Sequence, residues 1–395
     1  MNSLPGRIII SFLLILSSCG HENMPALKVF RDEPIPWDHK APCRIIYETG
    51  NKKINLEGNI KVRGGLSSRY AKHSYSLELN EKIDLCGLPS DDDWIINANY
   101  IDKTFMRHKI SYDLFREMGS NNIAPQCAFA EVYLNEVYNG LYVIMEEVNG
   151  GMVRLEKDDS MAMIFKDPPV FIQETLTWLQ EPGNYYQQKF PRIEERDMTY
   201  VMDEMREFLY YSSDGEFVKN IDQWFDIENV IDWHILLMFS NNGDAVRKNF
   251  YLYKLNSRTP FRFAIWDYDH TFGRDGDNEM NMMERELDCE RSVLIKRLVH
   301  SEYPDYKSRV AEKYFYLRKK NILSLENFRK HIEKNDRLIR NYTDRNFEKW
   351  PLDEKWYYDD NNYQQELDIM LEFVALRLDY LDNYFQDWLG KQDEE

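Results

Sequence analysis

Apolar and polar residues alternate along much of the first half of the chain from about residue 45. This period-two pattern, together with segments rich in β-forming residues, predicts strands at 54–63, 74–79, 128–134 and 141–148. The link between the last two ends in Asn139-Gly140, a pair typical of hairpin turns. Between the strand pairs, apolar residues at helical spacing predict one helix over 102–118. Residues 39–150 are therefore expected to form an antiparallel sheet with one packed helix.

The second half follows a helical pattern. Residues 168–200 are rich in Gln, Glu, Tyr and Pro and predict an irregular insertion or lid. Helical spacing is found at 199–211, at 222–239 and almost throughout after Ser292, and a hairpin-like pair is found at 249–255 and 261–266. An apolar stripe over 367–388 is expected to be core packing. Residues 151–390 are thus predicted to be a mainly helical lobe.

The N-terminus carries an export signal. Residues 1–18 have a short n-region with one Arg and an apolar run too short to span a bilayer, which takes about 20 residues. The run ends in Leu16-Ser-Ser-Cys19-Gly, which resembles a bacterial lipobox and implies lipidation of Cys19. We therefore expect a lipid-anchored protein, at the outer membrane or cell surface, with a tether over 19–38. The alternative is a plain secretory signal with a chance cysteine.

Composition limits the classes of partner. The 395 residues are 43% hydrophobic and 14% aromatic, as expected of globular domains. The formal net charge of −18 repels phosphate backbones and argues against a nucleic-acid partner. The four further cysteines show no CxxC spacing, which makes a zinc site an unlikely reading and leaves a disulfide and buried free thiols equally open: Cys43, Cys86, Cys127 and Cys289.

A first candidate site is the basic segment from Arg63 to Tyr75. Arg63-Gly64-Gly65 turns into Ser67-Ser68, and Lys72 begins the next strand. Glycines let backbone N–H groups approach an anion, hydroxyls add donors, and a lysine adds a point charge. A plain hairpin loop with solvated charges is the alternative.

A second candidate site consists of residues that precede and follow the predicted hairpin of 249–255 and 261–266. Asp244 is followed five residues later by Asn249, and Asp267 and Asp269 follow the next apolar strand. Kinases use such a set, in which the first Asp takes the substrate hydroxyl proton while the Asn and the later Asp hold Mg²⁺ on the nucleotide phosphates. The order of glycine-rich loop, strand lysine, helix, hairpin and helical half also follows that of a two-lobed kinase.

These motifs together resemble the CotH-type kinases, an atypical kinase family named for a spore coat protein H. The resemblance covers most of residues 45–390 and includes Trp94–Asn99 leading to Asp102 and Arg107, Asn139-Gly140-Leu-Tyr before Glu146-Glu147, Asp244 to Asn249, and Trp266-Asp-Tyr-Asp-x-Thr-Phe-Gly273. It implies an α+β, reduced two-lobed kinase-like fold that binds ATP with Mg²⁺ and phosphorylates protein.

The resemblance also implies residue roles. Asp244 would be catalytic, Asn249 and Asp267 would bind metal, and Asp269 is a second metal candidate. Lys72 would contact the nucleotide phosphates, beside Arg63, Gly64, Ser67 and Ser68, and the strand ending in Glu146 and Glu147 would be the hinge beside adenine. The His-Arg that usually precedes the catalytic Asp is replaced by Asn242-Gly243, and Glu117 is the candidate partner of the strand lysine.

Two alternatives come from other classes. Asp267-Tyr-Asp269-His-Thr271 also matches the DxDxT motif of haloacid dehalogenase-type phosphatases, although βαβ units should then follow and helices are predicted instead. A catalytically silent surface module is the other, since 26 Tyr and 9 Trp suit adhesion or sugar binding.

Overall fold

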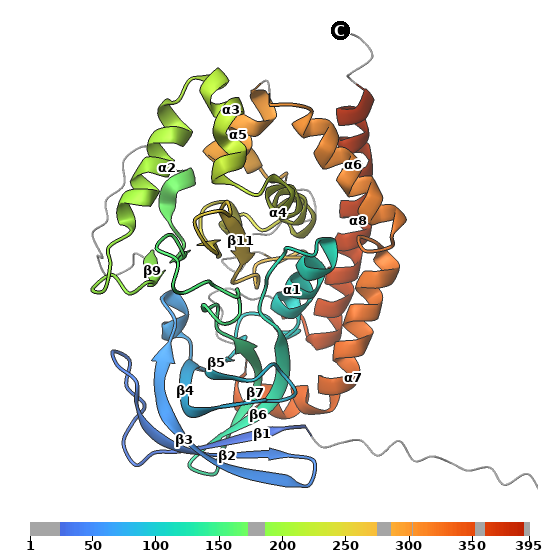
Figure 1. The fold of residues 1–395 in the computed structure, drawn as a ribbon. Coiled ribbons are helices and arrows are strands. Elements are labelled where there is room, and N and C mark those ends of the chain that lie inside the picture. The colour runs from blue at the N-terminus through green and yellow to red at the C-terminus, as the bar shows by residue number, and fades with distance from the viewer. Residues whose placement is uncertain (1–23, 173–185, 275–285, 302, 352–359, 391–395) are drawn as a thin grey trace, which may run out of the picture.

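The structure is a computed structural model that describes residues 24–172, 186–274, 286–301, 303–351 and 360–390. Its lower part in Figure 1 is a β-barrel formed by the first half of the chain, and its upper part is a smaller sheet surrounded by helices. Two long helices, α7 (Leu325–Lys349) and α8 (Tyr363–Gly390), run along one side of the molecule. The α+β class is thereby confirmed. The predicted signal peptide and Cys19 lie outside the described residues.

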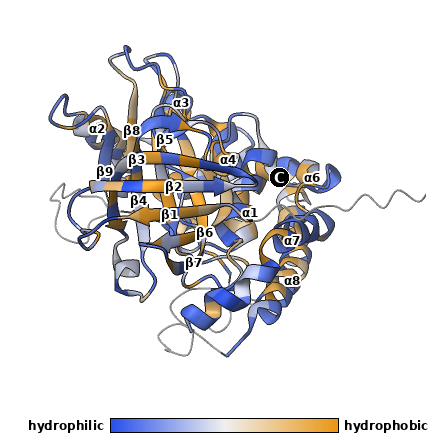
Figure 2. Ribbon diagram, turned by 90° about the horizontal axis from the view of Figure 1, so that it is seen from below, coloured by the Kyte–Doolittle hydropathy of each residue, from blue (hydrophilic) through white to orange (hydrophobic). Residues whose placement is uncertain are grey.

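Seven strands of the described chain close into the barrel, in the spatial order β1-β2-β3-β4-β5-β7-β6. They are β1 (Ala26–Phe30), β2 (Ala41–Thr49), β3 (Lys52–Arg63), β4 (Ser74–Ile83), β5 (Asp91–Asn97), β6 (Cys127–Leu134) and β7 (Val137–Glu146). Hydrophilic and hydrophobic residues alternate along these strands in Figure 2, because successive side chains point to opposite faces. The inward set, including Leu27, Ile45 and Trp94, fills the barrel interior.

Barrel closure corrects the expectation of a simple kinase-like antiparallel sheet. Neighbouring strands are antiparallel except β1 and β6, which pair in parallel from Ala26 opposite Glu131 and so close the sheet. The predicted tether over 19–38 is also wrong where it includes β1, since that strand is part of the barrel wall. Closure satisfies the backbone groups that the edges of an open sheet would expose.

The turn between β6 and β7 also differs from the prediction. The two strands meet at Asn135 and Glu136, whose φ angles of 47° and 66° are those of a two-residue hairpin turn. Gly140, with φ of 124°, lies inside β7 at an irregularity opposite Val132. An added Cβ there would meet Asn346 Oδ1 at 2.8 Å, so this glycine permits close packing of β7 against α7.

The second sheet has the order β11-β10-β8-β9, and all of its pairs are antiparallel. Its strands are β8 (Met163–Lys166), β9 (Gln187–Phe190), β10 (Phe250–Lys254) and β11 (Arg262–Ile265). The β10–β11 hairpin is the one predicted from the sequence. Strand β9 lies inside the segment predicted as an irregular insertion, of which residues 173–185 are outside the described chain.

The remaining helices cover the second sheet and extend from it. They are α1 (Arg107–Met118), α2 (Thr199–Tyr211), α3 (Asp214–Trp224), α4 (Ile227–Ser240), α5 (Val293–His300) and α6 (Tyr306–Lys319). The helix predicted over 222–239 is interrupted at Phe225, because Asp226 caps α4 by accepting a hydrogen bond from the Asn229 amide. The apolar stripe of α8 is buried against the core as predicted, through residues such as Met370, Val374 and Leu381.

Two further findings concern the cysteines and the character of the helices. Cys43, Cys86, Cys127 and Cys289 are all free thiols. Among the described helices, none combines the length and apolar character needed to cross a membrane.

Candidate active site

A cleft of about 950 Å³ lies between the barrel and the second sheet. The barrel contributes the end of β3, the loop after it and parts of β4 and β5. The opposite wall comes from β8, β10 and the loops that precede β10 and follow β11. Segments far apart in the sequence therefore meet here, and both predicted candidate sites contribute residues to the cleft.

The glycine- and serine-containing loop forms part of the cleft wall. Arg63, Gly64 and Ser67 line the cleft, and the chain then makes a short 3-10 turn over Leu66–Arg69. Gly64 has φ of 126°, and an added Cβ would lie 2.4 Å from Ser67 Oγ, so only glycine fits this turn. Ser68 is not among the lining residues, and its hydroxyl donates to Gly65 O at 2.6 Å.

Asp244 and Asn249 lie on the opposite wall, as the sequence predicted for residues of one site. Asp244 begins a 3-10 turn and its carboxylate contacts Lys248 Nζ at 3.1 Å. Asn249 has φ of 66°, and its side-chain N–H donates to the Asp267 carbonyl at 2.9 Å. This orientation leaves the Asn249 amide oxygen as the group suited to a hard cation.

Asp267 and Asp269 project from the loop after β11 on either side of the buried Tyr268. Asp267 has φ of 57°, and its backbone N–H donates to Tyr112 Oη of α1 at 2.9 Å. His108, from the first turn of α1, brings Nε2 to 3.4 Å from Asp267 Oδ1. Helix α1 therefore fixes both the backbone and the carboxylate of Asp267.

The pKa values of this cluster follow from burial and mutual charge. Burial raises the pKa of Asp267, but hydrogen bonding to and the charge of His108 outweigh it, so the pKa lies below the usual range. About half of the Asp267 side chain (51%) is exposed, and this part faces the cleft. Burial, followed by the negative charge of Asp267, raises the pKa of Asp269.

The cluster fits a divalent cation. Asp267, Asp269 and His108 each offer a ligand atom, and these atoms lie within 4.8 Å of one another. His108 is 2% exposed and packs against the Tyr112 ring, and its Nδ1 is buried without a hydrogen-bond partner among the described residues, so Nε2 is its polar contact with the cluster. The two carboxylates supply the hard oxygen ligands that Mg²⁺ and Mn²⁺ prefer, with water completing the shell, whereas the imidazole of His108 is a poor ligand for Mg²⁺.

Lys72 does not line the cleft, so its position does not support the predicted contact with nucleotide phosphates. The side chain is 1% exposed, and Nζ donates to Ala98 O at 2.8 Å and Leu141 O at 2.5 Å. The same nitrogen lies 4.3 Å from the centroid of the Tyr142 ring. Burial lowers the pKa of Lys72 well below its usual value, and its N–H groups are used by the two carbonyls.

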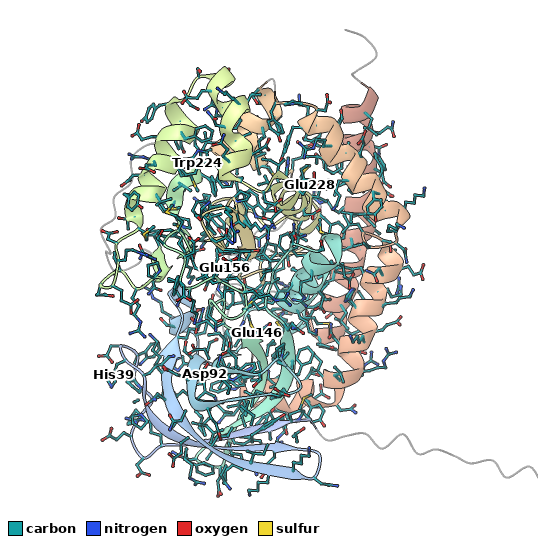
Figure 3. The ribbon with its side chains drawn as sticks, viewed as in Figure 1. His39, Asp92, Glu146, Glu156, Trp224 and Glu228 are labelled. Atoms are coloured by element: carbon teal, nitrogen blue, oxygen red, sulfur yellow. The ribbon has the colours of Figure 1, made fainter. Side chains whose placement is uncertain are left out.

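Of the two glutamates at the end of the predicted hinge strand, one lines the cleft and one does not, and the candidate partner of Lys72 lies elsewhere. Glu147 lines the cleft and pairs with Lys189 at 3.0 Å; burial opposes its ionisation, but Lys189 and Arg63 lower its pKa to about 2. Glu146, which is labelled in Figure 3, does not line the cleft, and its carboxylate accepts a hydrogen bond from the Gln126 backbone N–H at 2.7 Å. Glu117 contacts His331 and Asn327 rather than Lys72, so its position does not support that pairing either.

Sequence reasoning missed three residues of the cleft: His108, Lys166 and Asp167. Asp167 follows β8 and accepts backbone hydrogen bonds from Asn249 at 2.7 Å and Phe250 at 3.1 Å. It therefore holds the backbone beside the predicted metal ligand Asn249. No spacing rule links these three residues to Asp244 or Asp267, and the only sequence signal was that Lys166-Asp167 ends an apolar run.

Comparisons with known proteins identify the family of the chain. The family described as CotH kinase protein matches residues 60–381 of the chain. A curated relative, the inner spore coat protein H of Bacillus subtilis (strain 168), is 26% identical over 258 residues. That match covers 62% of this chain and 65% of the relative, so the chain spans less than two thirds of the relative's length.

Proposed function

The chain belongs to the CotH kinase protein family, and from that premise we propose that it transfers the γ-phosphoryl group of ATP to a hydroxyl group on a protein. The observation that carries the proposal is the convergence of Asp244, Asn249 and Asp267 in one cleft. The same three residues, at this spacing and order, perform base and metal-binding roles in kinases.

The reaction assigns one task to each group. The oxygen of the acceptor hydroxyl attacks the γ-phosphorus, and the bond from that phosphorus to the β–γ bridging oxygen breaks. ADP leaves with the electron pair, and the hydroxyl proton passes to the Asp244 carboxylate. Lys248, 3.1 Å from Asp244, fixes the orientation of this carboxylate.

Asp267, Asp269 and Asn249 would hold Mg²⁺, which neutralises charge on the phosphates. His108 and Tyr112 hold Asp267 from α1, through the 3.4 Å and 2.9 Å contacts. The segment from Glu147 to Gly150 lines the cleft on the barrel side, where the nucleobase would lie.

The phosphatase alternative receives no support from the surroundings of Asp267. A DxDxT nucleophile stands at the end of a strand in a doubly wound parallel sheet. Asp267 follows β11, which belongs to a small sheet whose pairs are all antiparallel. The catalytically silent surface module remains the alternative that the test below separates.

We also propose that the protein acts outside the cytoplasm, anchored through a lipidated Cys19. The lipobox-like sequence at residues 16–20 supports this location. Metabolic labelling with a fatty acid, compared between the wild type and Cys19→Ser, would test it, and label retained by the variant would contradict it.

The proposal predicts Mg²⁺-dependent ATP binding. In calorimetric titrations the wild type should bind ATP with Mg²⁺, and Asp267→Ala should lose that binding. Asp244→Ala should bind Mg-ATP as well as the wild type while turnover falls about 10²- to 10⁴-fold. Absence of nucleotide binding by the wild type would favour the silent surface module, and unchanged binding by Asp267→Ala would refute the metal assignment.

A further inference from the structure

The cleft needs a cation for nucleotide phosphates, and Lys72 cannot supply it. The Lys72 amine is used by two backbone carbonyls at the junction of β7 and the segment after β5. A triphosphate carries several negative charges, and its binding sites supply lysine or arginine side chains as well as the metal. Another basic residue of the cleft must therefore take this part if the proposed function holds.

Several basic side chains that line the cleft have carboxylate partners. Lys40 pairs with Glu78 at 2.8 Å, Lys189 with Glu147 at 3.0 Å, and Lys248 with Asp244 at 3.1 Å. Lys61, Lys157 and Arg192 also line the cleft, and Lys157 and Arg192 are exposed to solvent. Lys61, Arg63 and Lys166 remain, and of these Arg63 and Lys166 are the two that act on the loop of Trp266 and Asp267.

Lys166 is the last residue of β8 and directly follows the buried Phe165. Its side chain is 20% exposed, and Nζ lies 3.8 Å from Asp167 Oδ2, too far for a hydrogen bond. Asp167 already accepts two backbone hydrogen bonds through its other oxygen. Burial lowers the pKa of Lys166, and the charges of Asp167 and Asp267 oppose this change, so the amine lies within the field of the proposed metal ligand.

Arg63 reaches the same region from the barrel. It is the last residue of β3, and its guanidinium lies over the ring of Trp266, 5.0 Å from the centroid. Trp266 directly precedes Asp267. Burial raises the pKa of the Tyr251 phenol, while the charge of Arg63 and its hydrogen bond to the hydroxyl oppose that rise.

The strand register brings these two cations together. Lys166 is the direct partner of Tyr251 across β8 and β10, so their side chains share one face of the sheet. The charge of Arg63 acts on the same Tyr251 and further lowers the pKa of Lys166. Two like charges in a partly desolvated cleft repel one another, and an anion placed between them would relieve that repulsion.

We propose that Lys166, together with Arg63, is the phosphate-binding cation pair of the cleft and performs the task that the family pattern suggested for Lys72. The inference rests on the proposed nucleotide-binding function and deepens it. Both residues line the cleft that Asp267 also lines, and Arg63 lies over the ring of Trp266 next to Asp267, so the pair would contact the phosphates of a bound nucleotide. Lys72 instead joins the barrel to its neighbours.

The test compares matched lysine variants in calorimetric titrations with Mg-ATP, tripolyphosphate and adenosine. Lys166→Met should lower affinity for Mg-ATP and tripolyphosphate by about ten- to hundredfold, the size of a lost charge-assisted hydrogen bond. Affinity for adenosine should not change, and Lys166→Arg should restore part of the loss. Lys157→Met removes an equal charge from the exposed rim of the cleft and should change phosphate affinity less than threefold.

The outcomes separate the assignment of Lys166 as a phosphate-binding residue from the proposal that the protein is a kinase. Wild-type affinity for Mg-ATP in Lys166→Met, or an equal loss of adenosine binding, would overturn the assignment of Lys166. If the wild type binds tripolyphosphate through Lys166 but not ATP, the cation pair stands and the kinase proposal fails. If the wild type binds neither phosphate compound, both proposals fail.

Discussion

Two regions of this protein contain charged side chains in contrasting surroundings. At the junction of the barrel with α1, α7 and α8, Lys72, Asp102, Arg107 and Glu366 are almost fully buried and have protein partners. In the cleft, Asp244, Asp267 and Lys166 are partly exposed and line the same cavity. The four residues Lys72, Asp102, Arg107 and Glu366 are called the junction charges below.

The contrast separates charges that hold the fold from charges available to a ligand. Arg107 donates to Asp102 at 2.7 Å, to Glu366 at 3.1 Å and to the Thr271 carbonyl at 3.0 Å. It therefore ties α1 and α8 to the loop that carries Asp269. The junction charges have little freedom to bind another group, whereas the cleft charges, although they have partners such as Lys248 and His108, keep part of their side chains exposed to the cleft.

The largest expected effect is the loss of stability on removal of the Arg107 side chain from the junction charges. Arg107→Ala would leave the Asp102 carboxylate buried without its cation and should lower the free energy of unfolding by about 3–5 kcal/mol. Urea denaturation followed by circular dichroism would measure it. Lys330→Ala, which removes an exposed ion pair with Glu326 on α7, should cost less than about 1 kcal/mol. Equal losses in the two variants would mean that burial does not distinguish the junction from the surface.

A smaller effect is expected at the point where α1 reaches the cleft. His108→Asn removes the contact with Asp267 at 3.4 Å and should lower affinity for Mn²⁺ about ten- to hundredfold, with a smaller loss for Mg²⁺ because Mg²⁺ prefers oxygen ligands. Titration calorimetry with each ion, without nucleotide, gives the two constants. His300→Asn, outside the cleft, serves as the control. Unchanged Mn²⁺ affinity in His108→Asn would mean that this histidine, like the junction charges, contributes to the fold and not to cation binding.

The smallest expected effect concerns Lys72. Lys72→Met leaves Ala98 O and Leu141 O without this donor and should lower the free energy of unfolding by about 1 kcal/mol, with Mg-ATP affinity unchanged. A loss of Mg-ATP affinity at unchanged stability would contradict the placement of Lys72 outside the nucleotide site.

The pH dependence of that variant gives a second measure. The folded-state pKa of Lys72 lies below the ordinary 10.5, so the unfolded chain binds a proton that the folded chain lacks between the two values. This residue's contribution to stability therefore rises with pH in that window. The stability difference between the wild type and Lys72→Met should grow from pH 7.5 toward pH 10, and a constant difference would count against a depressed pKa.

Local pattern was sufficient for many elements and for part of the site. Alternation identified β3 and β4, helical spacing identified α2 and the last helices, and the β10–β11 hairpin was predicted at its observed position. Asp244, Asn249, Asp267 and Asp269 were predicted together and do line one cleft, because they flank the two strands of a hairpin. Short-range geometry fixes such a set once the hairpin forms.

Long-range pairing was beyond the sequence pattern. Strand β1 is five residues long, in a segment with the polar, proline-containing composition of a tether, and only its parallel pairing with β6 makes it part of a barrel. The hairpin turn was placed at Asn139-Gly140, but Asn135 and Glu136 make the turn while Gly140 allows α7 to approach.

The sequence by itself determined the secondary structure of most of the chain, the acidic motif of the cleft and the family to which the chain belongs. These depend on residues close together along the chain, whose spacing is written in the sequence. The tertiary structure decided which basic residue faces the cleft. Barrel closure directs Lys72 toward backbone carbonyls, while the packing of β8 and α1 brings Lys166 and His108 beside Asp267. The direction of a side chain depends on which distant elements pack around it, and no local pattern encodes that.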